Sequence, residues 1–302
     1  MSVVLPIQYM RGVAALMVVW HHARGQLPGL SALLPNGFGA HGVDLFFVIS
    51  GFIMVLTTTS TETTPWRFLK RRLVRVVPLY WLVTLALVVL TMVSPNLLNT
   101  VKPTPSTTLM SLLFIPHISV GNPGMPWPIL VPGWTLNYEM FFYAMFALSL
   151  FAPKPLAWLL SALVALVGVG WLLGPFESPI SKTYTSPLLL EFAAGACIGR
   201  LWVVMTPRWR WLKWRSVALK ALGDASYSIY ITHMLTLAAL RMVWLRIDSH
   251  PSEPLHGLVF MPIALALCAF VGLAVYRMIE RSFSRLFSSL RENKRLADVP
   301  SV

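Results

Sequence analysis

The sequence predicts an all-α polytopic membrane protein with about eight to ten transmembrane helices. Of its 302 residues, 56% are hydrophobic and only 12% are charged, and the mean hydropathy is +0.69. A soluble domain carries about twice that share of charged residues. Several apolar stretches also reach about 20 residues, the length that crosses the hydrocarbon core of a bilayer. Together these observations exclude a soluble globular fold.

Eight apolar stretches of spanning length follow one another along the chain, without an internal repeat. They cover residues 4–23, 40–58, 73–94, 134–152, 156–174, 185–204, 225–246 and 257–276.

A ninth stretch, 107–118, is apolar but short. It contains Pro116 and His117 and runs into a segment rich in glycine and proline, 121–133. Because helices rarely continue through such segments, we expect 107–118 to be a partial span that is re-entrant or lies on the outer surface.

The positions of the basic residues predict the orientation. Most of the 24 lysines and arginines fall in alternate connections, and only Arg24, Lys102, Lys182 and Arg246 flank the opposite side. Cytoplasmic loops of membrane proteins are enriched in lysine and arginine. Both termini are therefore expected in the cytoplasm, with 285–302 as a polar cytoplasmic tail. The net charge of +13 then indicates contact with anionic membrane lipids and not with nucleic acid.

Arg11 and His22 are polar residues inside the first apolar stretch. Eleven residues make about three helical turns, so the two side chains share one face of a helix, roughly 16 Å apart along its axis. His21 falls about 80° away from that face. Such groups are costly in lipid unless they face a protein or water-lined interior. We therefore interpret Arg11 and His22 as functional residues.

Asp44 and Glu139 are acidic residues that we expect near the outer ends of their helices, at about the depth that His22 reaches. A carboxylate beside an imidazole fixes its tautomer and raises its basicity, which makes the imidazole a general base. The three groups are thus candidates for a catalytic cluster. The alternative, that Asp44 only caps a helix at the membrane interface, stays open.

A run of five basic residues precedes the third apolar stretch: Arg67, Lys70, Arg71, Arg72 and Arg75. Arg72 and Arg75 are three residues apart and share one helix face. Paired guanidinium groups match phosphate oxygens in a way that lysine cannot, which favours a phosphate-bearing ligand that enters from the cytoplasm. The alternative is an anchor that binds anionic lipid.

Three further residues are interpreted as lining a substrate path: Tyr138, Tyr230 and His233. His233 is expected about 12 Å into its helix, near the bilayer midplane. A lone histidine there is as often a hydrogen-bonded core group as a catalyst, and Tyr138 also fits an interfacial aromatic belt. No metal site is expected, because His21 and His22 point to different faces and no two histidines are four residues apart.

These residues resemble the motifs of the acyltransferase-3 family of integral membrane acyltransferases, and among its members they are most similar to the exopolysaccharide production O-acyltransferases of bacteria. The resemblance covers nearly the whole chain. It rests on five segments in order: Arg11 and His22 separated by ten residues, GVDLFFVISG at 42–51, RLVR at 72–75, WTLNYE at 134–139 with Phe142 and Tyr143, and SYSIY at 226–230 with His233.

The resemblance implies transfer of an acyl group, usually acetyl, from cytoplasmic acetyl-CoA to a hydroxyl of an exopolysaccharide or a lipid-linked sugar. It implies a single acyltransferase domain over 1–284, in the bacterial inner membrane. It also makes His22 the catalytic histidine and Arg11, Arg72 and Arg75 candidates for donor binding. Members of the family commonly have about ten spans. The short link 206–220 takes the place of a helical hairpin found in longer members.

Two mechanisms are compatible with these residues. In the first, His22 acts as a general base on the sugar hydroxyl, oriented by Asp44 or Glu139, and the hydroxyl attacks the thioester directly. In the second, the acyl group passes through a covalent intermediate on His22.

A different class of function, a proton-coupled transporter or glycan exporter, also uses intramembrane histidine, acid and arginine residues. Two features favour a transferase over a transporter: the pair Arg72 and Arg75, which suits a phosphate-bearing donor, and the lack of an internal sequence repeat.

Overall fold

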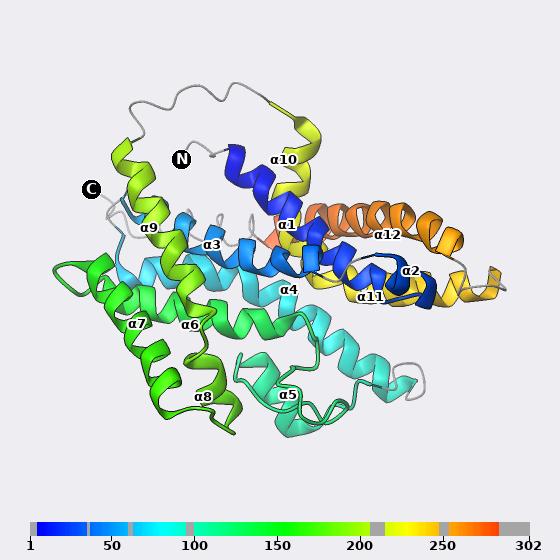
Figure 1. Cartoon of the computed structure of the whole chain (residues 1–302), viewed down its shortest axis with the longest axis horizontal. Helices are drawn as coiled ribbons and strands as arrows, with labels where there is room; N and C mark the ends of the chain where they lie inside the picture. The colour runs from blue at the N-terminus through cyan, green and yellow to red at the C-terminus, as the bar shows by residue number, and fades with distance from the viewer. Residues whose placement is uncertain are drawn as a thin grey trace, which may run out of the picture.

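The computed structural model describes residues 5–34, 37–59, 63–94, 100–205, 215–247 and 254–283, and the regular structure of these residues is entirely helical (Figure 1). The predicted tail 285–302 lies outside the described residues. The long helices are α1 (Leu5–Arg24), α3 (Gly37–Thr59), α4 (Pro65–Val93), α6 (Gly133–Ser149), α7 (Pro155–Leu173), α9 (Leu189–Met205), α11 (Ser226–Ile247) and α12 (Pro254–Val275). The short ones are α2 (Pro28–Leu33), α5 (Pro105–Leu112), α8 (Pro179–Tyr184), α10 (Val217–Asp224) and a π-helical turn, η2 (Tyr276–Glu280).

Each of the eight predicted stretches coincides with one long helix, which confirms the all-helical fold. Within the described residues, six helices are long and apolar enough to cross a membrane. Neither α1 nor α6 is among them: α1 contains Gln8, Arg11 and two histidines, and α6 has only 17 residues. The predicted count of eight to ten spans is therefore not confirmed by length and composition.

The ninth stretch, 107–118, is only partly helical, as predicted. α5 begins with a capping box between Thr104 and Thr107 and ends at Leu112 after eight residues. Phe114 then has a positive φ of 57°, which ends the regular helix. Eight residues span about 12 Å, far less than the hydrocarbon core of a bilayer. This segment is therefore too short to cross a membrane as a helix.

Close packing between α3 and α9 shows that these two helices are parallel. A Cβ atom added to Gly195 would lie 1.9 Å from the carbonyl oxygen of Val48, and one added to Gly199 would lie 2.9 Å from that of Phe52. The residue numbers of the contacting positions therefore increase in the same direction along both helices. Three long helices, α4, α6 and α7, lie between α3 and α9 in the chain. If all three cross the membrane, the parallel arrangement requires that α5 does not add a fourth crossing.

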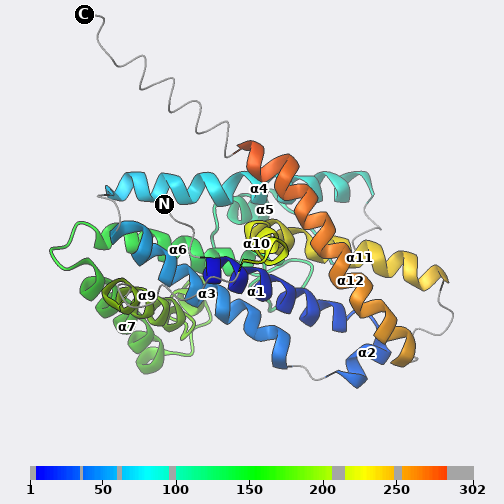
Figure 2. The ribbon, with the colours of Figure 1, turned by 90° about the horizontal axis from the view of Figure 1, so that it is seen from above.

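The first helix runs antiparallel to α3 through the middle of the molecule. Gly39 packs against His21, and Gly42 packs against Ala14. At the other end of α1, Gly223 of α10 packs against the backbone of Gln8. In Figure 2, α1 and α3 lie between the group α10–α12 and the group α6, α7 and α9. Polar side chains of α1 can therefore contact polar groups from both of these helix groups.

Two apolar cores hold the helices together. The larger includes Phe47, Tyr80, Phe142 and Phe192, from α3, α4, α6 and α9. The smaller joins α1, α2, α11 and α12. Large apolar side chains also cover outward faces: Leu172 of α7, for example, is 84% exposed. Apolar surface of this extent on a soluble protein would aggregate, so these faces are suited to lipid.

Candidate functional site

A pocket between α1, α3, α4, α6 and α11 contains most of the predicted polar residues. Its empty volume is about 710 Å³, the open space at its mouth included. Its charged lining residues are Arg11, Arg72, Arg75 and Glu139, and its other polar side chains are those of Ser50, Thr135, Tyr143, Tyr227 and Tyr230. Three guanidinium groups face one carboxylate here, so the pocket carries an excess of positive charge. Such a lining is suited to an anionic ligand.

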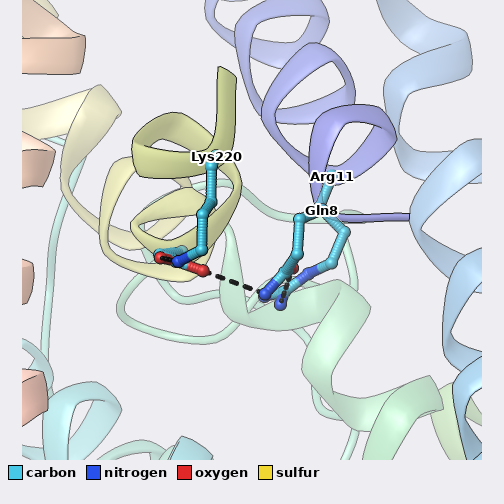
Figure 3. Close-up of polar contacts among 4 residues, drawn as sticks. Gln8, Arg11 and Lys220 are labelled. Atoms are coloured by element: carbon cyan, nitrogen blue, oxygen red, sulfur yellow. Dashed lines mark hydrogen bonds and ion pairs between the residues drawn. The ribbon is translucent and has the colours of Figure 1, made fainter. Parts of the chain in front are cut away.

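Arg11 is held by a chain of hydrogen bonds from the start of α1 to α10 (Figure 3). Its Nη1 donates to Oε1 of Gln8 at 3.0 Å, and Nε2 of Gln8 donates to Oδ1 of Asp224 at 2.9 Å. Lys220 donates to the other carboxylate oxygen of Asp224 at 2.6 Å, and this hydrogen bond raises the pKa of Lys220. Arg11 is only 7% exposed, so its orientation depends on its bond to Gln8 and on the bond that fixes Gln8 to Asp224.

Arg72 and Arg75 lie on the same face of α4, as their spacing predicts, but they differ in their partners. Nη2 of Arg72 donates to Thr57 at 3.0 Å, and its guanidinium lies 5.6 Å from the ring centroid of Phe68. Arg75 makes no hydrogen bond or ion pair to the described residues, yet it lines the pocket. Arg72 is thus fixed within the protein, whereas Arg75 has all its donors available for a ligand.

Glu139 is oriented by two hydroxyl groups at the pocket wall. Ser50 of α3 donates to its Oε1 at 3.0 Å, and Tyr143, one helical turn further along α6, donates to the same oxygen. The second oxygen has no such partner among the described residues. Glu139 therefore faces the three arginines of the pocket with one oxygen still able to accept a hydrogen bond.

His22 lies outside the lining of this pocket, next to a second histidine. Its ring centroid is 5.1 Å from that of His233 on α11 and 5.1 Å from that of His21. Nδ1 of His233 in turn lies 2.5 Å from the carbonyl oxygen of Tyr230. The structure therefore brings His22 and His233 together, a pairing that the sequence alone does not predict.

Tyr230 connects the pocket to the two histidines. Tyr230 and Phe46 both line the pocket, and their rings contact each other at 5.6 Å. The ring of Tyr230 also contacts the ring of His233, with the two centroids 5.7 Å apart. Its hydroxyl is fixed between Thr135, at 2.7 Å, and the carbonyl oxygen of Pro132. The histidine pair is thus linked to the pocket through Tyr230.

Asp44 and Tyr138 lie away from the pocket lining. Asp44 pairs with His41 at 2.7 Å, and its side chain is 41% exposed. Among the described residues, neither Asp44 nor Glu139 makes a hydrogen bond to His22. Tyr138 contacts the rings of Phe47 and Trp134. The predicted catalytic trio is therefore dispersed in this structure, whereas the three predicted donor-binding arginines converge.

Several polar residues in or near the site were given no role from the sequence, although Tyr143 belongs to one of the family motifs. Gln8 precedes Arg11 by three residues, and Tyr143 follows Glu139 by four; at these spacings side chains meet on a helix. From this spacing the sequence could have predicted the contacts of Gln8 with Arg11 and of Tyr143 with Glu139. Glu280 of η2, which accepts a hydrogen bond from Ser228 at 2.6 Å, had no comparable signal, because its partner is far away in the sequence.

Comparison with known proteins identifies the family of this chain. A family model for an acyltransferase domain matches residues 5–218 and 154–275. The chain is 34% identical over 299 residues to the exopolysaccharide production protein ExoZ of Rhizobium meliloti (strain 1021), with 82% of this chain and 90% of that protein covered. No solved structure matches the chain. The family model spans the helices that carry the pocket and both histidines, and the chain therefore belongs to the acyltransferase-3 family of membrane acyltransferases.

Proposed function

We propose that this protein is an O-acyltransferase that moves an acetyl group from cytoplasmic acetyl-CoA to a sugar hydroxyl of an exopolysaccharide or of its lipid-linked precursor. Membership of an acyltransferase family supports the transfer reaction. The name of the relative, an exopolysaccharide production protein, supports a polysaccharide as the acceptor.

The three arginines of the pocket are the observation that carries the choice of donor. Arg11, Arg72 and Arg75 come from two helices and line one partly enclosed pocket. CoA carries three phosphate groups, and guanidinium groups bind phosphate oxygens in pairs of parallel hydrogen bonds. A donor head group bound here would place its thin pantetheine arm towards Phe46 and Tyr230. Tyr230 contacts His233, which contacts His22.

The reaction requires four changes at the thioester. A nitrogen of His22 takes the proton from the acceptor hydroxyl, and the hydroxyl oxygen forms a bond to the acyl carbon. The bond between that carbon and sulfur then breaks, and the thiolate of CoA takes the proton back from His22. The arginines do not exchange protons in this scheme; they hold the donor. Since a sugar hydroxyl attacks directly, no acyl-enzyme accumulates.

We also propose the bacterial inner membrane as the location, with both termini in the cytoplasm. The basic residues Arg67, Arg71 and Arg200 lie at helix ends on one side, next to the connections that contain most of the positive charge. The arginines of the pocket lie towards the same side. Arg11 and Arg72 both fall in the first half of their helices, α1 and α4, which begin on that side. Donor entry from the cytoplasm follows from this orientation.

The test is acetyl transfer by purified protein. With acetyl-CoA and the de-acetylated polysaccharide of the producing strain, we expect release of CoA and gain of one acetyl mass per modified sugar, measured by mass spectrometry. His22→Ala should abolish both while the melting temperature in detergent stays within a few degrees of wild type. Retention of transfer by a folded His22→Ala protein would contradict the role of His22.

A second measurement separates the two mechanisms. Protein incubated with acetyl-CoA alone and then digested should contain no acetylated His22 peptide if the hydroxyl attacks directly. An acetyl group on His22 that is lost on addition of acceptor would instead establish the covalent route.

A further inference from the structure

His233 is a fully buried histidine in the middle of α11, and one of its two nitrogens has no partner. The side chain is 0% exposed. Nδ1 lies 2.5 Å from the carbonyl oxygen of Tyr230, whereas Nε2 is buried and makes no hydrogen bond to the described residues. A buried polar atom without a partner costs about 1–3 kcal/mol, so such an atom calls for an explanation.

The contact with Tyr230 determines the tautomer of His233. A carbonyl oxygen can only accept a hydrogen bond, so Nδ1 must carry the proton. In the neutral ring Nε2 is then an acceptor. We assign this tautomer from the hydrogen-bond pattern. His233 therefore presents a bare, buried acceptor nitrogen to its surroundings.

His22 is the group in a position to use that nitrogen. The centroids of the two rings are 5.1 Å apart. Each ring nitrogen lies about 1 Å from its centroid, so a turn of the rings that points one nitrogen at the other would bring them to about 3 Å, which is hydrogen-bonding distance. In this structure that bond is not formed. Hydrogen bonds of catalytic groups are often long in the absence of substrate and shorten in the complex.

The two carboxylates that the sequence suggests for orienting His22 make their hydrogen bonds with other residues. Asp44 pairs with His41 at 2.7 Å, and Glu139 accepts from Ser50 and Tyr143 at the pocket wall. The other aromatic neighbour of His22 is His21, its neighbour in the sequence, whose ring stands edge-on to it at an interplanar angle of 81°. Among the ring contacts of the described residues, His233 is the one that reaches His22 from a different helix.

We propose that His233 is a positioning residue for His22, and this rests on the proposed acyltransferase function. Nε2 of His233 accepts a hydrogen bond from the ring N–H of His22. That bond holds His22 in the tautomer whose other nitrogen is bare and faces the acceptor hydroxyl. When His22 takes the proton of the hydroxyl, the same bond stabilises the resulting imidazolium. His233 itself exchanges no proton and contacts neither substrate.

Two substitutions of His233 separate this role from a purely structural one. The amide of glutamine lies where Nε2 of histidine lies, so His233→Gln keeps an acceptor for His22 but gives up the bond to Tyr230. The amide of asparagine lies at the position of Nδ1, so His233→Asn keeps a donor for Tyr230 but has nothing to offer His22. A matched control is Thr236→Val, one turn further along α11, where a buried hydroxyl donates only to Thr232.

The expected result is a difference in kcat at nearly constant KM for acetyl-CoA. His233→Asn should lower kcat at least 100-fold, His233→Gln should retain within about 10-fold of the wild-type kcat, and Thr236→Val should be close to wild type. Melting temperatures in detergent identify any variant that fails to fold. Equal losses in both His233 variants, or a larger loss in His233→Gln, would contradict the proposal.

Failure of this inference can be told apart from failure of the proposed function. If His22→Ala is inactive and the His233 variants are both as active as wild type, only the positioning role is wrong. If wild-type protein transfers no acyl group from acetyl-CoA to polysaccharide, the proposed function itself is wrong.

Discussion

Gln8 accepts a hydrogen bond from Arg11 at 3.0 Å, and the same carboxamide donates to Asp224 at 2.9 Å. One side chain thus connects the arginine of the pocket to a carboxylate of α10 (Figure 3). Gln8 and Arg11 are three residues apart on α1, whereas Asp224 is far away in the sequence. The orientation of Arg11 is therefore determined jointly by the helix and by the packing of α10 against it.

Replacement of Gln8 by leucine should weaken donor binding. Gln8→Leu removes the acceptor of Arg11 and leaves a buried guanidinium without its partner, which we expect to raise KM for acetyl-CoA by about 5- to 20-fold, in line with a lost hydrogen bond to a charged group. kcat should change much less. Lys220→Met is the control, because Lys220 contacts Asp224 and not Arg11. A larger rise in KM for the control would contradict this arrangement.

Arg75 should contribute to donor affinity without contributing to stability. It makes no hydrogen bond to the described residues, so Arg75→Met should raise KM for acetyl-CoA about 10-fold or more and leave the melting temperature unchanged. S-acetylpantetheine lacks the phosphate groups of CoA, and its KM should be unaffected. Arg67→Met, in the same basic run but exposed, is the control for general charge effects. An equal effect on both donors would exclude phosphate binding by Arg75.

Much of the fold could be predicted from composition alone. The stretch 4–23 became α1, and 156–174 became α7, because a run of about 20 apolar residues has few other stable arrangements in lipid. α4 begins earlier than the predicted 73–94, since Thr64 caps it and its basic residues extend the helix. Sequence spacing also placed Arg72 beside Arg75.

The partners of the histidines could not be predicted in the same way. Whether His22 meets Asp44, Glu139 or His233 depends on which helices pack together and how they are rotated. Depth in the membrane narrows this choice without deciding it: Asp44 and Glu139 were both expected at the depth of His22, and His233 was expected nearer the bilayer midplane. The packing of Gly39 against His21 and the contact of α1 with α11 decide it, and neither has a local signal.

Gly195 should be among the least tolerant positions of the fold. A Cβ atom there would lie 1.9 Å from the carbonyl oxygen of Val48, so Gly195→Ala forces α3 and α9 apart. We expect a loss of about 1–3 kcal/mol, the usual cost of overpacking, seen as a lower melting temperature in detergent. Gly168→Ala in α7 is the matched control, because nothing lies within 4 Å of the added atom. Equal stability of the two variants would contradict the close packing of α3 and α9.

The arrangement of α5 predicts which side of the membrane each connection reaches. Lys102 precedes α5, and Met125 follows it. If α5 does not cross, both residues lie on one side, whereas Lys154, beyond α6, lies on the other. Lys102 and Lys154 are exposed, and Met125 is 39% exposed, so cysteines at these positions should be accessible to reagents.

Labelling of single cysteines in intact cells tests this prediction. In a background with Cys197→Ala and Cys268→Ala, we expect a membrane-impermeant maleimide to label Lys102→Cys and Met125→Cys from outside. Lys154→Cys should react only after the membrane is permeabilised, as the distribution of basic residues requires. Labelling of Lys102→Cys and Met125→Cys from opposite sides would mean that 107–118 crosses after all. If Lys154→Cys were labelled from outside and the other two only after permeabilisation, the fold would stand but the orientation would be inverted. The arginine pocket would then open away from the cytoplasmic pool of acetyl-CoA.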